Sequence, residues 1–108
     1  MAAMLGAFEQ AVLLSIVRLR EEAYGRAILR EVQARLDRTV AAGAVHVTLN
    51  RLERRTLLLS ELGAGTELRA GRPRRYYTLT TEGRLALNQA HAGVHQLWRG
   101  YKPLRSTV

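Results

Sequence analysis

The feature that most constrains the fold of this sequence is a pair of short strand-like runs separated by a glycine-rich stretch. The runs are "TLLLSEL" (56–62), which is mostly apolar, and "RRYYTLT" (74–80), in which tyrosine and threonine favour extended structure. Between them, "GAGTELRAGRP" (63–73) combines glycines with a proline, residue types that interrupt regular structure. The segment therefore predicts a β-hairpin with a long connecting loop.

Helical patterns surround this hairpin. Three precede it, over about 5–20, from after Tyr24-Gly25 to about Leu36, and over about 42–55. The first also carries apolar residues on its other faces, so we expect it to be buried on more than one side. The apolar stripes of these three helices are Phe8, Val12, Ile16 and Leu19; Ile28, Val32 and Leu36; and Val45, Leu49 and Leu52.

The second and third helices are joined by the short turn "DRT" (37–39), an arrangement typical of a helix-turn-helix. Opposite its apolar stripe, the third helix carries the polar and basic residues His46, Asn50, Arg51 and Arg54. A helix-turn-helix followed by a basic hairpin predicts a winged helix-turn-helix. This fold is α+β and mostly α.

The last helical pattern, over about 81–101, has an apolar seam at alternating spacings of three and four residues, as in a coiled coil. The seam either packs on its own domain or pairs with a second copy. We favour a homodimer, because the helix is long and terminal, with no further element to cover it. The prediction is a DNA-binding domain over 1–80 and a dimerisation helix with a tail over 81–108. The seam residues are Leu87, Ala90, Val94, Leu97 and Tyr101.

The charge of the chain is strongly basic and unevenly distributed. The sequence has 17 basic and 9 acidic residues, a net charge of +8, of which +7 lies in residues 51–108. A basic half favours a polyanionic partner, through attraction to phosphates and release of counterions. Sixteen of the basic residues are arginine, which a GC-rich genome would also produce, so charge alone leaves the partner open.

Two surfaces carry residue types that suit double-stranded DNA. Asparagine pairs with adenine and arginine with guanine in the major groove, as the polar face of the third helix would require. The hairpin arginines can reach phosphates or the minor groove. The alternatives are a solvated face and loop, and for Arg51 an ion pair with Glu53, with Glu61 or with a neighbouring subunit. The predicted DNA-contacting residues are Thr39, His46, Asn50, Arg51, Arg54, Arg72, Arg74 and Arg75.

The sequence argues against catalysis, a cofactor and a metal site. There is no cysteine, which excludes disulfides and thiolate sites. His91 and His95 are four residues apart, but "HAGVH" lacks the glutamate of a metalloprotease motif and no carboxylate lies within one helical turn. The glycine-rich stretch lacks the Gly-Lys-Ser/Thr ending of a P-loop, and no nucleophile–base pair is evident. We expect a protein that is not an enzyme and binds no cofactor.

Length and hydrophobicity predict one domain and no membrane partner. A chain of 108 residues suits a single modest core. The apolar run "AVLLSIV" (11–17) has seven residues, far short of the ~20 needed to span a bilayer. The N-terminus does not read as a signal peptide. We therefore expect a cytoplasmic protein.

Three blocks together resemble the PadR family of bacterial transcriptional regulators: "LGAFEQAVLLSIVRLREEAYGRAI" (5–28), "GAVHVTLNRLERR" (43–55) and "GRPRRYYTLTTEGRLAL" (71–87). They are most similar to its short members, which end after one C-terminal helix. The resemblance covers about residues 5–90. It implies a homodimeric winged-helix repressor of a DNA operator, with the first and last helices forming the dimer interface.

The resemblance also implies a place for an effector, because effectors of the family are often small aromatic or drug-like molecules. An aromatic residue on the last helix can line a cavity between the subunits and stack on flat ligands. The alternative is that Trp98 only fills the dimer core. The implied effector residues are Phe8, Ser15 and Trp98, and the implied dimer interface comprises Phe8, Leu87, Ala90, Val94, Leu97, Trp98 and Tyr101.

Three positions depart from the family pattern. His46 stands where a tyrosine is common, which would alter operator preference or phosphate contact. Ala41 stands where a serine or threonine caps the helix start, so one acceptor is missing unless Thr39 supplies it. Thr56 stands where relatives end the helix with glycine. Because a β-branched residue in the left-handed region costs roughly 1–2 kcal/mol, we expect the helix to end differently.

A second class of function stays open at this point. A winged-helix scaffold for protein interactions would not read DNA, and its basic hairpin would meet an acidic protein surface. Replacing Arg72, Arg74 and Arg75 with alanine separates the two, because only a DNA reader should lose affinity and salt dependence. RNA binding is disfavoured, because no aromatic residues are arrayed on an exposed sheet.

Overall fold

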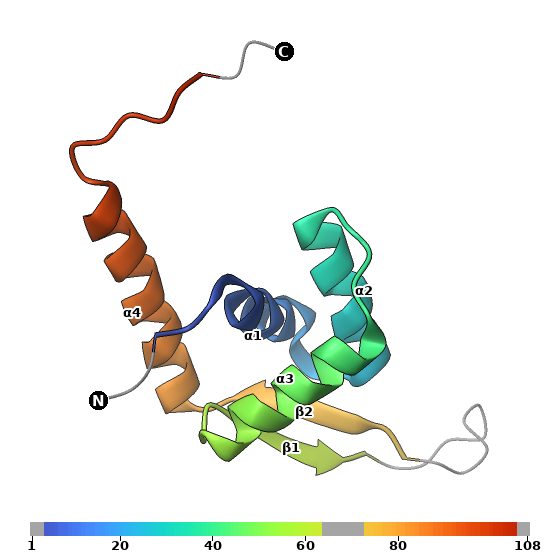
Figure 1. Ribbon diagram of the computed structural model, residues 1–108. Coiled ribbons are helices and arrows are strands. Elements are labelled where there is room, and N and C mark those ends of the chain that lie inside the picture. Colours follow the sequence, from blue (N-terminus) through green and yellow to red (C-terminus); the bar gives the residue numbers. More distant parts are fainter. Residues whose placement is uncertain (1–3, 64–72, 106–108) are drawn as a thin grey trace.

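The computed structural model describes residues 4–63 and 73–105. Figure 1 shows α1 at the centre, α2 and α4 on opposite sides of it, and α3 and the sheet below. This arrangement confirms the predicted α+β, mostly helical winged-helix fold. The elements are α1 (Ala7–Leu19), the 3-10 helix η1 (Arg20–Glu22), α2 (Gly25–Leu36), α3 (Ala42–Arg54), β1 (Leu58–Leu62), β2 (Arg75–Leu79) and α4 (Thr81–Trp98).

The predicted hairpin is present as an antiparallel pair of strands, with the register running from Leu58 opposite Leu79 to Leu62 opposite Arg75. The segment before α2 adds to the free edge of β2. The Tyr77 amide donates to the Ala23 carbonyl over 2.9 Å, next to an isolated bridge between residues 24 and 76. The wing, formed by β1 and β2, is therefore hydrogen-bonded to the segment that leads into α2, the first helix of the helix-turn-helix.

The core is built around α1, which is buried on more than one side as predicted. Val12, Leu13 and Ile16 of α1 pack with the buried stripes of α2 and α3 and with the inward residues of both strands. Of α4, only Gly83 and Ala90 are buried. The helix therefore contacts the body near its base while most of its surface stays outside the core.

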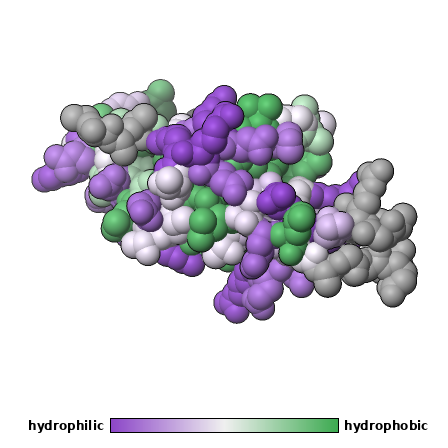
Figure 2. All heavy atoms as spheres, turned by 90° about the horizontal axis from the view of Figure 1, so that it is seen from below, coloured by the Kyte–Doolittle hydropathy of each residue, from purple (hydrophilic) through white to green (hydrophobic). Residues whose placement is uncertain are grey.

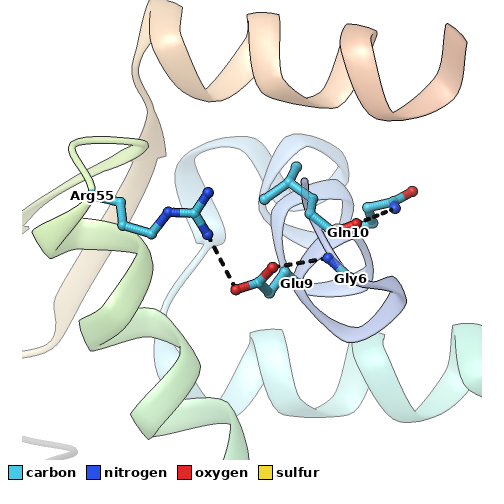
Figure 3. A network of polar contacts seen from close by, with 5 residues as sticks. Gly6, Glu9, Gln10 and Arg55 are labelled. Atoms are coloured by element: carbon cyan, nitrogen blue, oxygen red, sulfur yellow. Dashed lines mark hydrogen bonds and ion pairs between the residues drawn. The ribbon is translucent and has the colours of Figure 1, made fainter. Parts of the chain in front are cut away.

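A polar network joins the start of α1 to the end of α3 (Figure 3). Glu9 accepts from the Gly6 amide over 2.9 Å through Oε1 and from Arg55 Nη1 over 3.3 Å through Oε2. Gln10 Nε2 donates to the Leu5 carbonyl over 3.0 Å. Because Arg55 is the C-cap of α3, this network fixes the end of α3 to the central helix.

The end of α3 contradicts the expectation at Thr56. This threonine adopts φ 62°, the left-handed conformation that relatives assign to glycine. The Thr56 amide donates to the Glu53 carbonyl over 2.9 Å and the Leu57 amide to the Leu52 carbonyl over 3.0 Å, which together make a Schellman motif. Because the turn must deliver Leu57 and Leu58 into the core, tertiary packing overrides the local cost of a β-branched residue.

The same turn receives the start of α4. Thr80 Oγ1 donates to the Thr56 carbonyl over 2.7 Å and accepts from the Gly83 amide over 2.9 Å, which caps α4. A Cβ on Gly83 would lie 2.2 Å from the Leu57 carbonyl oxygen. Only a glycine allows α4 to approach this backbone so closely.

The predicted end of the last helix was wrong. α4 ends at Trp98, because Arg99 turns to an extended ψ of 131° and Gly100 has φ 83°. Tyr101 therefore lies outside the helical seam, with its ring 5.5 Å from that of Trp98 in an edge contact. Within the described residues, no helix is long and apolar enough to cross a membrane.

Candidate nucleic-acid interface

The outward face of α3 carries the polar residues predicted to contact DNA. His46, Asn50, Arg51 and Arg54 are exposed, whereas Val45, Thr48, Leu49 and Leu52 on the other side are buried. Asn50 Nδ2 lies 3.4 Å from His46 Nε2, so the two side chains hold one another on the surface. Figure 2 views the molecule from the sheet side and shows polar atoms interspersed with smaller apolar areas.

Arg51 and Arg54 are the two arginines of this face. Across residues 4–63 and 73–105, no ion pair involves Arg51 or Arg54. The alternative partner Glu53 instead accepts a hydrogen bond from Ser60 Oγ over 2.7 Å. Both cations are therefore available to an anion outside the chain.

The start of α3 lacks a side-chain cap, as its sequence suggested. Ala41 is the N-cap, and no side chain caps the helix there. Thr39 is exposed in the turn, and the Val40 amide donates to Gln33 Oε1 over 2.9 Å. Gln33, which sequence reasoning missed, therefore supports the turn, and the first amides of α3 remain open at the surface.

A groove of about 690 Å³ separates α3 from the start of β2 and is bounded by the start of α2. It brings together basic residues from segments that are far apart in the sequence. Arg26 and Arg30 were not predicted, although their spacing of four residues puts them on one face of α2. The basic and polar residues of this basic groove are Tyr24, Arg26, Arg30, His46, Arg74 and Arg75.

Arg74, which directly precedes β2, packs on an aromatic ring. Its guanidinium carbon lies 4.0 Å from the centroid of the Tyr24 ring, within range for a cation–π interaction. Tyr24 in turn meets the Tyr76 ring edge-on at 5.8 Å. Arg74 Nε is buried without a hydrogen-bond partner in the described residues. The side chain is held in place while part of its donor capacity stays unused.

Arg75, which also lines the basic groove, is hydrogen-bonded within the chain. Arg75 Nη1 donates to Ser60 Oγ over 3.0 Å, and Ser60 Oγ donates to Glu53 Oε2 over 2.7 Å. Burial and the Glu53 charge raise the pKa of the neighbouring Tyr77, an effect that Arg75 opposes. Arg72, the third predicted wing arginine, lies outside the described residues.

A second groove, of about 700 Å³, runs between α1 and α4. It contains apolar side chains that a single chain leaves in solvent, among them Leu14 at 38% and Trp98 at 50% exposure. Leu97, which also lies on α4, is 75% exposed. The residues lining this α1–α4 groove are Gln10, Leu14, Val17, Arg84, Leu87, Asn88, His91, Val94, His95 and Trp98.

The residues predicted to bind an effector are not brought together. Trp98 lines the α1–α4 groove, but Phe8 and Ser15 do not. Ser15 is fully buried, and its hydroxyl has no hydrogen-bond partner in the described part of the chain, whereas Phe8 packs against the core of its own chain. The physical reason is helical periodicity, because the groove side of α1 is set by Gln10 and Leu14, which project in a different direction.

The other residues predicted to form the dimer interface are partly buried in the chain's own core and partly exposed. Ala90 is buried in its own core and Leu87 packs against it, whereas Val94 is exposed. His91 and His95 line the groove with their rings nearly parallel, 6.5 Å apart. Among the described residues, no three metal-ligating side chains come together.

Comparisons with known proteins agree on one family. A model of the Transcriptional regulator PadR-like family matches residues 13–89. A solved PadR family transcriptional regulator from Eggerthella lenta is 35% identical over 82% of this chain and 75% of its own, with a TM-score of 0.65. A PadR family transcription regulator from Clostridium difficile is 27% identical, over 87% and 88% of the two chains, with a TM-score of 0.58. A PadR-like transcriptional regulator from Bacillus cereus is 24% identical, over 88% and 94%, with a TM-score of 0.64. No curated protein sequence matches the chain.

Proposed function

Since the chain belongs to the PadR-like family of transcriptional regulators, we propose that it is a homodimeric, sequence-specific DNA-binding regulator that represses transcription from a pseudo-palindromic operator. The observation that carries the proposal is the position of the exposed polar face of α3 beside the basic groove. In the proposed complex, the α3 helices of two copies enter successive major grooves about 34 Å apart.

The basic groove supports a phosphate-binding role. Arg26 and Arg30 are exposed on α2, and Arg74 is held on the opposite wall by Tyr24. Phosphate contacts fix the register of a protein on the duplex, and base contacts then read the sequence. In this assignment the arginines of the groove position the protein, and His46 and Asn50 contact bases.

The α4 surface supports the homodimer. A single chain leaves Val94, Leu97 and Trp98 exposed along α4, and burying such side chains is the main driving force for association. The radius of gyration is 16.0 Å, compared with about 13 Å for a compact domain of this length. The single chain is thus extended, with α4 leading away from the body (Figure 1).

An effector would act at the same interface. The α1–α4 groove offers the Trp98 indole for stacking and polar groups such as Gln10 and Asn88 for orientation. A flat aromatic molecule bound there would change the spacing of the two α3 helices and release DNA, by stabilising the arrangement that does not fit the operator.

The first experiment measures binding by fluorescence anisotropy. The probes are a duplex from upstream of the protein's own gene and a scrambled duplex of the same composition, each at low and physiological salt. We expect two chains per site and a preference of about a thousandfold or more for the first duplex. Equal, weak binding to both would overturn the proposal and favour the interaction scaffold.

A charge variant shows which surface binds. Arg51→Gln with Arg54→Gln should weaken binding and lower the slope of log affinity against log salt by about one for each lost phosphate contact. Arg99→Gln, which removes an exposed charge beyond α4, is the matched control and should leave both unchanged. If the control and the α3 variant behaved alike, the positive charge would act only generically.

A further inference from the structure

One exposed residue of α3 is neither polar nor basic. Val47 is 51% exposed, and none of the DNA contacts predicted from the sequence includes it. Among the described residues, Val47 belongs neither to the hydrophobic core nor to the partly buried residues packed against it, and it does not line the basic groove. Its role must therefore be sought outside the single chain.

Val47 occupies the middle of the outward face. Gly43, Val47, Asn50 and Arg54 follow one another at spacings of four, three and four residues, so they form one stripe along α3. The buried stripe through Leu49 lies on the opposite side. The stripe changes from a small residue through an apolar one to a polar and then a basic one, from the start of the helix to its end.

Two residues of this stripe are locally unfavourable for a helix. Valine loses side-chain freedom in a helix, and glycine loses more backbone freedom than any other residue. A Cβ on Gly43 would meet nothing within 4 Å, so packing within the chain does not require a glycine there. A small residue one turn before Val47 does allow another surface to approach the helix closely.

We propose that Val47 contacts the C5-methyl group of a thymine in the major groove and thereby sets a thymine preference at one position of each half-site. The proposal rests on the DNA-binding function proposed above. The thymine methyl is the one apolar group that the bases present in that groove, and side chains with methyl groups are its usual partners. Asn50, one turn further along, would contact the neighbouring base pair.

The surroundings of Val47 favour DNA over a protein partner. Arg51 and Arg54, on the same face, carry no ion pair among the described residues, and the basic groove adjoins it through His46. A single apolar side chain surrounded by basic residues can contact a single methyl group on a polyanion such as DNA. A protein interface would require a larger apolar centre.

The test removes the methyl group from the DNA. The probe is the tightest-binding duplex selected from a random-sequence pool by the unaltered protein, in which each thymine is replaced in turn by deoxyuridine. We expect replacement at one symmetry-related pair of positions to weaken binding about fourfold per half-site, the effect of one buried methyl group. Val47→Ala should bind the original duplex more weakly and be insensitive to that same replacement.

A matched variant distinguishes a thymine contact by Val47 from a general effect of losing exposed apolar surface. Leu59→Ala removes an exposed apolar side chain from the outer face of β1 and should keep the full sensitivity to deoxyuridine. Circular dichroism checks that both variants remain folded, and Val47→Thr, which keeps one methyl group, should retain part of the effect. A selected duplex whose deoxyuridine profile is the same for the unaltered protein and Val47→Ala would overturn the inference and leave the regulator function standing. Failure to select any sequence would overturn both.

Discussion

The exposed surfaces of α3 and α4 differ in how far one chain completes them. On α3 the apolar stripe is fully buried, and the polar face is organised by bonds within the chain, such as the contact between His46 and Asn50. On α4 the apolar residues beyond Ala90 remain in solvent, and Leu97 is 75% exposed. The first surface is ready to bind a polar, charged partner, whereas the second still requires an apolar one.

The two helices are held to the body of the protein in different ways. α3 is held at its end by Arg55 and the Schellman turn at Thr56, so its orientation is set by the core. α4 is fixed mainly at its base, through Thr80 and Gly83. The helix that carries the predicted DNA-contacting residues is thus fixed within the chain, whereas the part of α4 beyond Ala90 remains largely exposed.

The largest expected effect comes from disrupting the contact between the start of α4 and the turn that ends α3. Gly83→Ala places a methyl group 2.2 Å from the Leu57 carbonyl oxygen, a backbone atom, so we expect a loss of about 3 kcal/mol of unfolding free energy. Urea denaturation measures it. Gly93→Ala in the same helix, where a Cβ meets nothing within 4 Å, should be neutral or stabilising. Equal stabilities for the two variants would contradict the close approach.

The next effect concerns only the α4 surface. Leu97→Glu would place a charge in the proposed dimer interface, and we expect it to weaken association by about 2 kcal/mol or more while leaving the fold of the monomer intact. Sedimentation velocity over a concentration series measures the dimer. Leu104→Glu, in the exposed segment beyond α4, is the control. A variant that stays as dimeric as the control would show that this face pairs with something else.

A gain is expected at the turn that ends α3. Thr56→Gly relieves the left-handed conformation of a β-branched residue and should raise the unfolding free energy by roughly 1–2 kcal/mol. Thr78→Gly, the same change in strand β2, should lower it, because glycine weakens a strand. Thermal melts of the two variants give the opposite signs. A loss of stability in Thr56→Gly would mean that its hydroxyl contributes more than the strain removes.

The smallest effect tests the base of the wing. Tyr24→Leu removes the ring beneath Arg74, and Arg74→Gln removes the cation, so a double-mutant cycle should show a coupling of about 0.5–1 kcal/mol. Tyr24→Phe keeps the ring and should preserve the coupling. An additive cycle, with no coupling in urea denaturation, would indicate that the stacking does not hold the wing to α2.

Local patterns predicted most of the architecture because apolar periodicity reports burial directly. The stripes through Ile28 and Val32 and through Val45 and Leu49 are buried as predicted, and the two predicted strands pair antiparallel. The same periodicity identified the outward face of α3. The assignment of that face to DNA contact remains a prediction for the experiments above.

The errors arose where distant segments meet. Thr56 was expected to avoid the left-handed region, but the turn is imposed by the core residues that follow it. Tyr101 was placed on a helix that ends at Trp98. In the single chain Phe8 and Ser15 lie on a different side of α1 from the groove that Trp98 lines, so their grouping at a site between two subunits stays a prediction.

The order of helices and strands and their apolar faces could be predicted from the sequence, because both depend on neighbours within a few residues, and the excess of positive charge follows from composition. Which charges converge depends on the tertiary structure. The basic groove combines Arg26 and Arg30 of α2 with Arg74 of the wing, residues more than forty positions apart in the sequence. The convergence depends on how α2 and β2 pack on the shared core, and helical or strand periodicity carries no information about distances between elements.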